Sequence, residues 1–246
     1  MFVQDTVTVP VTELARVQAI AERRAAESVF DMHAAELSNA LTAFLDTHPG
    51  GTGIEERDLK ATYTRSAAYL KAIAGFQHHQ TKVRALNIVY NYFQPNTRAL
   101  DLGCCAGFTG LALRLSGWPN VDFADFEGLG LEFVRQFCLG KGWQAEVHPY
   151  DLADGALGGV PCYELVLAFD VIEHTPNQLA FIEWLRRLGK YVAITWPTVG
   201  WRPPLYQPID AWVDQEATMW VIERRYRVLE AWLEDSRQFV LFETGV

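Results

Sequence analysis

The sequence lacks a long apolar run. None of its 246 residues belongs to a stretch that is long and apolar enough to cross a bilayer, so we expect no membrane partner. Residues 1–6 carry no positive flank and no apolar core, and so do not resemble a secretory signal. Both observations favour a cytoplasmic protein.

Cysteine is scarce and does not have the spacing of a metal site. The four cysteines are Cys104, Cys105, Cys138 and Cys162, and none is spaced with histidine as zinc ligands are. Two of them are adjacent, and adjacent cysteines rarely pair with each other. The pattern predicts a reduced, intracellular protein.

Positive charge is also scarce. The chain has 21 Lys and Arg against 30 Asp and Glu, a net charge of −9, and no basic run. Affinity for nucleic acid comes largely from neutralised phosphates, which makes a nucleic acid an unlikely partner. We interpret the small group Arg224, Arg225 and Arg227 as solvated surface.

Apolar residues make up 50% of the chain, enough for a full core. Helical spacing of these residues predicts helices over 11–45, 55–74 and 78–93, with Pro-Gly-Gly-Thr-Gly at 49–53 between the first two. From there strands alternate with helices. The predicted strands are 98–102, 121–125, 146–150, 164–169 and 191–195, followed by a hairpin of 226–233 and 238–243. This order predicts an α/β fold with a mostly parallel sheet and helices on both faces.

The segment 101–110 lies where the first strand turns into a helix. Gly103 and Gly107 allow backbone angles closed to other residues and the close approach of a ligand. Asp125 ends the second strand, where an acid can bind ribose hydroxyls, and Asp122 is the weaker candidate. A dinucleotide site requires Gly-x-Gly-x-x-Gly, and the second glycine is absent. A nicotinamide-dependent oxidoreductase stays open as a disfavoured alternative.

Four motifs in order resemble the class I S-adenosylmethionine-dependent methyltransferases. They are Asp-Leu-Gly-Cys-Cys-Ala-Gly-Phe-Thr-Gly at 101–110, Phe-Ala-Asp-Phe at 123–126, Tyr-Asp-Leu at 150–152 and Phe-Asp-Val-Ile-Glu-His at 169–174. The resemblance covers roughly residues 86–246 and implies a Rossmann-like, seven-stranded sheet that ends in an antiparallel hairpin. Residues 1–85 then form a helical extension or cap, which could also make a dimer contact.

The resemblance implies S-adenosylmethionine as cofactor, S-adenosylhomocysteine as product, and methyl transfer to an oxygen, nitrogen or carbon atom. The implied cofactor-binding residues are Asp101, Gly103, Cys105, Gly107, Asp125, Phe126, Asp151, Leu152, Phe169 and Asp170. The family often has glycine where this chain has Cys105. We expect Cys105 to be a small packed residue, because nothing nearby in the sequence would stabilise a thiolate.

His174 is a candidate general base for the acceptor, since its ordinary pKa is near neutral. It could instead shape the pocket together with Glu173. The set Asp170, Glu173 and His174 also resembles part of the metal site of RNA 2′-hydroxyl methyltransferases. Those enzymes need a further downstream histidine, and none follows His174; we expect no metal.

The predicted acceptor is a small molecule, held between the N-terminal helices and the segment after the fifth strand. The predicted substrate residues are His78, His79, Trp196 and Trp201, with Tyr63 and Tyr69 nearby. The two tryptophans could stack on a flat substrate or only pack a lid. A non-catalytic domain that holds the cofactor, or nothing, remains the alternative, because Cys105 departs from the usual loop.

Overall fold

The structure is a computed structural model that describes residues 29–50, 64–76, 80–150, 162–175, 177–198, 215–234 and 236–245. Residues 29–32, 73–76, 80 and 215 are described by their backbone alone. The predicted site residues outside the described residues are Tyr63, His78, His79, Asp151, Leu152 and Trp201. The predicted helical segments before residue 29 and over 55–63 lie outside them as well.

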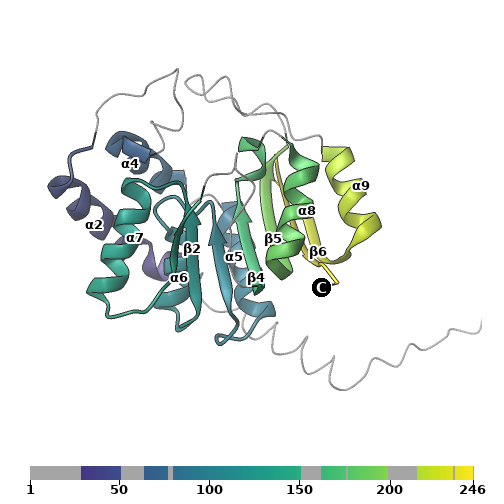
Figure 1. Cartoon of the computed structure of the whole chain (residues 1–246), viewed down its shortest axis with the longest axis horizontal. Helices are drawn as coiled ribbons and strands as arrows, with labels where there is room; N and C mark the ends of the chain where they lie inside the picture. Colours follow the sequence, from purple (N-terminus) through teal and green to yellow (C-terminus); the bar gives the residue numbers. More distant parts are fainter. Residues whose placement is uncertain are drawn as a thin grey trace, which may run out of the picture.

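A seven-stranded sheet forms the centre of the molecule (Figure 1). Its order is β3-β2-β1-β4-β5-β7-β6. The strands are β1 (Ala99–Leu102), β2 (Val121–Asp125), β3 (Val147–Pro149), β4 (Tyr163–Phe169), β5 (Gly189–Pro197), β6 (Arg227–Glu234) and β7 (Arg237–Glu243). The first five run parallel, and β7 pairs antiparallel with both β5 and β6. The predicted Rossmann-like sheet with a terminal hairpin is confirmed.

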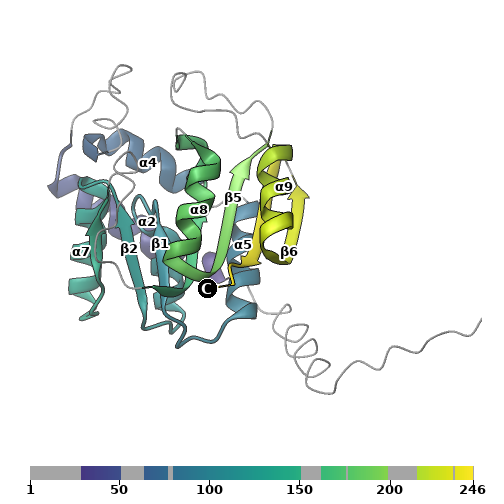
Figure 2. The ribbon, with the colours of Figure 1, turned by 45° about the vertical axis from the view of Figure 1, so that its right-hand side comes forward.

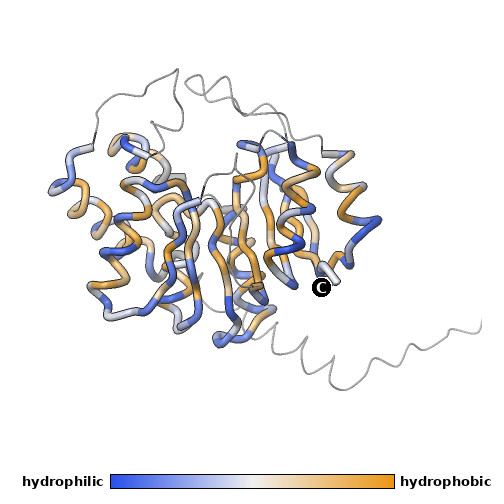
Figure 3. Tube along the Cα trace, viewed as in Figure 1, coloured by the Kyte–Doolittle hydropathy of each residue, from blue (hydrophilic) through white to orange (hydrophobic). Residues whose placement is uncertain are grey.

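Helices cover both faces of this sheet (Figure 2). α2 (Val29–Thr47), α5 (Gln80–Tyr92), α6 (Phe108–Leu115) and α7 (Leu129–Gly140) share one hydrophobic cluster with one face. α8 (Gln178–Leu188) and α9 (Gln215–Arg225) share a second cluster with the other. In β4, Leu165 and Leu167 join the first cluster while Val166 and Ala168 join the second. Burial on both faces explains why most residues of the central strands are apolar (Figure 3).

α8 passes directly into β5 at Gly189. Gly189 is the C-cap residue of α8, but its φ of −149° is extended and it already begins β5. A glycine at this position is explained by packing, because a Cβ there would lie 2.6 Å from Cγ2 of Val166. β5 consequently starts two residues before the predicted strand.

The described part of residues 1–85 packs on the sheet domain. Leu37 and Leu41 of α2 are buried in the same cluster as the sheet. α4 (Ala67–Phe76) lies beyond the end of the sheet at which α7 begins (Figure 1). A Cβ on Gly128, which precedes α7, would lie 2.5 Å from the carbonyl oxygen of Thr64. The proposed division at residue 85 falls inside α5, and it stays a prediction.

Candidate functional site

The turn between β1 and α6 has a left-handed backbone at three residues. Gly103, Cys105 and Gly107 have φ values of 66°, 52° and 68°. A Cβ on Gly103 would lie 2.5 Å from Val171, and one on Gly107 would lie 2.6 Å from Val134. Both glycines are therefore required by conformation and by space. The turn leads directly into α6, whose first N–H groups have no partner within the helix itself.

Cys105 stands at the position of this turn where the family often has glycine. It is partly buried and packs against the larger hydrophobic cluster. Burial raises the pKa of its thiol to about 12, and the nearby charge of Asp125 adds to that effect. A thiol that does not ionise near neutral pH is a poor nucleophile, which supports the expectation of a packed residue.

Two buried carboxyl groups shape the turn. Asp101 Oδ2 accepts a hydrogen bond of 2.8 Å from the backbone N–H of Gly110. The pKa of Asp101 is raised to about 7, mainly by burial; the hydrogen bond from Gly110 opposes this rise and the charge of Asp125 adds to it. The Asp125 carboxylate accepts hydrogen bonds from the N–H groups of Cys105 and, at 2.6 Å, Phe126. A carboxylate has about four acceptor positions, so Asp125 keeps capacity for a ligand hydroxyl.

The carboxylate of Asp122, the weaker candidate for binding ribose, is bonded to other residues of the protein. Its Oδ2 accepts a hydrogen bond of 3.1 Å from Tyr163 and lies 3.4 Å from Arg98. Its Oδ1 accepts the N–H of Glu146 at 3.0 Å. Asp122 lies near the amino end of β2, opposite Leu100, whereas Asp125 ends the strand. It holds the edge of the sheet together rather than facing the turn.

Asp170 follows β4 and also has a left-handed backbone, with φ 57°. Its Oδ2 lies 2.9 Å from Nζ of Lys82 and pairs with Arg237, while Oδ1 accepts a bond of 2.9 Å from Thr195. Burial alone would raise the pKa of Asp170, but the charges of Lys82 and Arg237 outweigh it and hold that pKa well below its ordinary value. Asp170 thus forms the centre of a buried ionic cluster.

Sequence reasoning missed the three partners of Asp170. Lys82 comes from α5, Thr195 from β5 and Arg237 from β7. They are separated by tens of residues, and no motif links them. The adjacent strands β4, β5 and β7 bring Thr195 and Arg237 to the carboxylate, and the packing of α5 on the sheet brings Lys82. No signal in a single sequence would have found this set.

The short helix η1 (Ile172–His174) places Glu173 and His174 beside this cluster. Glu173 is 7% exposed, and burial raises its pKa to about 7, with His174 opposing and Asp170 adding to the rise. His174 Nε2 lies 4.0 Å from Glu173 Oε1. The charge of His174 also opposes the burial-induced rise in the pKa of Asp125. His174 is therefore within electrostatic range of the carboxylate that ends β2.

The three residues considered as a metal set do not converge. In the part of the chain that the structure describes, the His, Cys, Asp and Glu group with ligand atoms within 4.8 Å of one another is Asp122, Glu146 and His148. That group lies on the far edge of the sheet, and Arg98 is paired with both of its carboxylates.

Two predicted aromatic positions lie in the core. Trp196 is fully buried in the cluster beneath α8 and α9, with 0% exposure. This corrects its assignment to the substrate, because no face of the ring is open to a ligand. Phe169 is also buried, at the end of β4. Phe126 contributes the backbone N–H that binds Asp125, and Tyr69 of α4 is buried.

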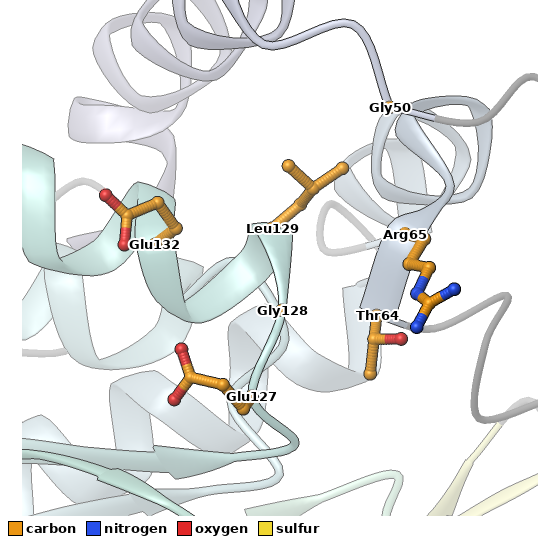
Figure 4. A pocket seen from close by; sticks show the side chains of 7 residues that line it. All are labelled: Gly50, Thr64, Arg65, Glu127, Gly128, Leu129 and Glu132. Atoms are coloured by element: carbon orange, nitrogen blue, oxygen red, sulfur yellow. The ribbon is translucent and has the colours of Figure 1, made fainter.

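A pocket of about 490 Å³ opens next to the end of β2 (Figure 4). Its described lining consists of Gly50, Thr64, Arg65, Glu127, Gly128, Leu129 and Glu132. Thr64 and Arg65 lie on one side and the two glutamates on the other, with Leu129 between them (Figure 4). Glu127 follows Asp125 by two residues, so this pocket lies next to the carboxylate that binds the glycine turn.

No protein-family model and no curated protein matches the sequence. Solved structures do match. TehB from Haemophilus influenzae aligns with TM-score 0.53 and 16% identity over 68% of this chain, which spans only 62% of the TehB chain. An S-adenosylmethionine-dependent methyltransferase from Aquifex aeolicus aligns with TM-score 0.53 and 17% identity, over 72% of this chain and 97% of its own.

Magnesium protoporphyrin IX methyltransferase from Synechocystis PCC 6803, solved with bound S-adenosylhomocysteine, aligns with TM-score 0.55 and 16% identity, over 73% of this chain and 86% of its own. Among the described residues, no helix combines the length and the apolar character that a bilayer span requires. Together, the strand order β3-β2-β1-β4-β5-β7-β6 and these alignments identify the fold: the chain has the Rossmann-like fold of the class I S-adenosylmethionine-dependent methyltransferases.

Proposed function

We propose that this protein binds S-adenosylmethionine and transfers its methyl group to an oxygen, nitrogen or carbon atom of a small molecule. The observation that carries the proposal is the glycine turn after β1 joined to the carboxylate that ends β2. Gly103 and Gly107 give the turn its left-handed backbone and its close packing on the sheet domain, and Asp125 retains acceptor capacity beside it. This cradle fits the methionine and ribose parts of the cofactor.

In this proposal the 103–107 turn holds the methionine end and Asp125 holds the ribose. The adenosine side lies toward the end of β2, where the pocket lined by Glu127 and Leu129 opens. Asp151 and Leu152 follow β3 in the sequence, and we retain them as the adenine-side residues. The described α4 lies over the same end of the sheet as the pocket.

When bound, S-adenosylmethionine supplies a methyl group on a positively charged sulfur that is already activated for transfer. The protein then contributes mainly position, and holding two reactants in line supplies much of the rate gain. His174 is about one-third exposed and lies at the carboxyl end of the central strands, where it can accept a proton from the acceptor. Asp170 holds the end of β4 in place through its ionic partners.

Melting temperatures measured with S-adenosylmethionine, S-adenosylhomocysteine and NAD test the cofactor. A ligand that binds only the native state raises the melting point, and we expect this from the first two ligands and not from NAD. Stabilisation by NAD alone would contradict the proposal. Incubation of the protein with methyl-labelled cofactor and a small-molecule extract then tests turnover. Binding without label transfer would favour the non-catalytic alternative.

A further inference from the structure

Three glycines lie where the start of α7 meets two other parts of the chain, the glycine turn and the cap segment, by which we mean residues 64–67. They are Gly50, Gly128 and Gly130, and none of them has a left-handed backbone. Gly128 has an extended backbone with φ 171°, which any residue adopts. Glycine at these positions is therefore explained by space, because neighbouring segments leave no room for a Cβ.

The cap segment packs closely on the start of α7. A Cβ on Gly128 would lie 2.5 Å from the carbonyl oxygen and 2.6 Å from the Cα of Thr64. A Cβ on Gly50 would collide with the carbonyl oxygen of Arg65 and would lie 2.5 Å from Cδ1 of Leu129. Backbone atoms cannot rotate away from such a contact as the end of a side chain can. Gly50 and Gly128 therefore fix where the cap segment meets the start of α7.

The stretch 125–130, which leads into α7, also contacts the glycine turn. At one end of the stretch, the Asp125 carboxylate accepts a hydrogen bond from the N–H of Cys105. At the other end, a Cβ on Gly130 would lie 2.5 Å from the carbonyl oxygen of Cys105. The stretch thus touches the turn at both of its ends and the cap segment between them, at Gly128.

The pocket beside α7 opens along this contact. One of its walls comes from Gly50 and the cap segment, and the other comes from the start of α7 (Figure 4). Ser66 joins the cap segment to α4, because its Oγ accepts the N–H of Tyr69 and its carbonyl accepts the N–H of Leu70, both at 3.1 Å. A shift of the cap segment would therefore move α4 and one wall of the pocket together.

We propose that Gly128 is a positioning residue that couples docking of the cap segment to binding of S-adenosylmethionine. The inference rests on the proposed function, which puts the cofactor between the glycine turn and this pocket. A docked cap segment holds the stretch 125–130 in the position that shapes the turn and completes the pocket. The coupling is reciprocal, so a bound cofactor also stabilises the docked cap segment.

Hydrogen exchange of the α4 amides and calorimetric titration with S-adenosylhomocysteine test this coupling in the full chain. Gly128→Ala and Gly50→Ala should both speed exchange in α4 and weaken the ligand about fivefold or more, as coupling between two sites commonly does. Gly50→Ala separates the cap from the turn, because the backbone atoms that its Cβ would meet belong to the cap segment. Gly140→Ala is the matched control. Gly140 is the last residue of α7, and a Cβ there meets nothing within 4 Å, so both measurements should stay at their wild-type values.

The pattern of exchange distinguishes coupling from general destabilisation. In the wild type, saturating S-adenosylhomocysteine should slow exchange in α4, because reciprocity requires the ligand to stabilise the docked cap segment. In Gly128→Ala and Gly50→Ala without ligand, exchange should be faster in α4 and unchanged in the central strands β4 and β5. A substitution that only destabilised the fold would speed exchange in those strands as well.

Faster exchange in α4 with unchanged affinity in either variant would overturn the proposal, since the cap segment would then dock independently of the ligand. Unchanged exchange of α4 in both variants would also overturn it, because the two glycines would not determine where the cap segment docks. If Gly128→Ala does not fold, Gly50→Ala alone decides between these outcomes. Failure of the wild type to bind S-adenosylhomocysteine would instead refute the proposed function.

Discussion

The carboxylate of Asp125 at the end of β2 accepts a hydrogen bond from the backbone N–H of Cys105 in the turn after the neighbouring strand β1. One side chain thereby fixes the turn that we propose as the methionine cradle. The same carboxylate is our proposed ribose ligand. Loss of Asp125 should affect both the shape of the turn and the contact with the cofactor.

Asp125→Ala should therefore weaken S-adenosylmethionine and S-adenosylhomocysteine alike, by roughly tenfold to a hundredfold, because hydrogen bonds to a charged group are worth about 1.5–3 kcal/mol. Calorimetric titration measures this. Asp122→Asn is the control, since Asp122 lies on the same strand but holds Tyr163 and Arg98. That variant should lose stability and keep its affinity. Unchanged affinity in Asp125→Ala would mean that another acid binds the ribose.

The left-handed backbone of Cys105 predicts a difference between two substitutions. Both Cys105→Ala and Cys105→Gly remove the thiol, but only glycine adopts φ 52° without strain. We expect the glycine variant to be more stable than the alanine variant by about 1 kcal/mol in urea unfolding, which is the usual cost of left-handed backbone for other residues. Equal stabilities would show that the turn relaxes to another conformation.

The buried cluster around Asp170 should dominate the local stability. Asp170→Asn removes the carboxylate that pairs with the buried Lys82 and Arg237, and removing one partner of a buried pair costs about 3–5 kcal/mol. Chemical unfolding at pH 7 measures the loss. The control is Glu164→Gln, whose side chain is exposed on the same strand, β4.

The pH dependence of that cluster has a definite sign. The pKa of Asp170 is lower in the folded protein than in the unfolded chain, so its contribution is fully present above about pH 4 and is lost as the pH falls further. Wild type should lose stability in acid more steeply than Asp170→Asn. Parallel stability curves for the two proteins between pH 5 and pH 2 would contradict the assignment.

The correction of Trp196 to the core can be tested directly. Trp196→Ala should destabilise the protein by about 3–5 kcal/mol, the usual cost of removing a large buried aromatic side chain. Trp196→Phe should cost less because it keeps most of the packing. At temperatures where the variants are folded, their affinity for S-adenosylmethionine should equal that of wild type. A large loss of affinity in the stable Trp196→Phe variant would return this residue to the ligand site.

The sequence alone determined the layers of the fold. Strands such as 164–169 are apolar at every position after Glu164 because they are buried on both faces, and this pattern together with the intervening helices predicts a parallel sheet. The turn from Gly103 to Gly107 was recognisable for a similar reason. Its glycines, the strand before it and the helix after it are contiguous in the chain, so local sequence records the whole motif.

Tertiary structure alone decided which groups meet. Thr195 and Arg237 reach Asp170 because β5 lies beside β4 and β7 lies beside β5, and Lys82 reaches it from α5. Neither strand order nor helix packing is written in any short segment. The same reason explains why the sequence did not predict that Trp196 is buried. Trp196 directly precedes a proline-rich segment, but its ring packs beneath α8 and α9. Burial and charge at a site are sums over neighbours distant in the chain, so the ionic cluster around Asp170 could be found only in the folded protein.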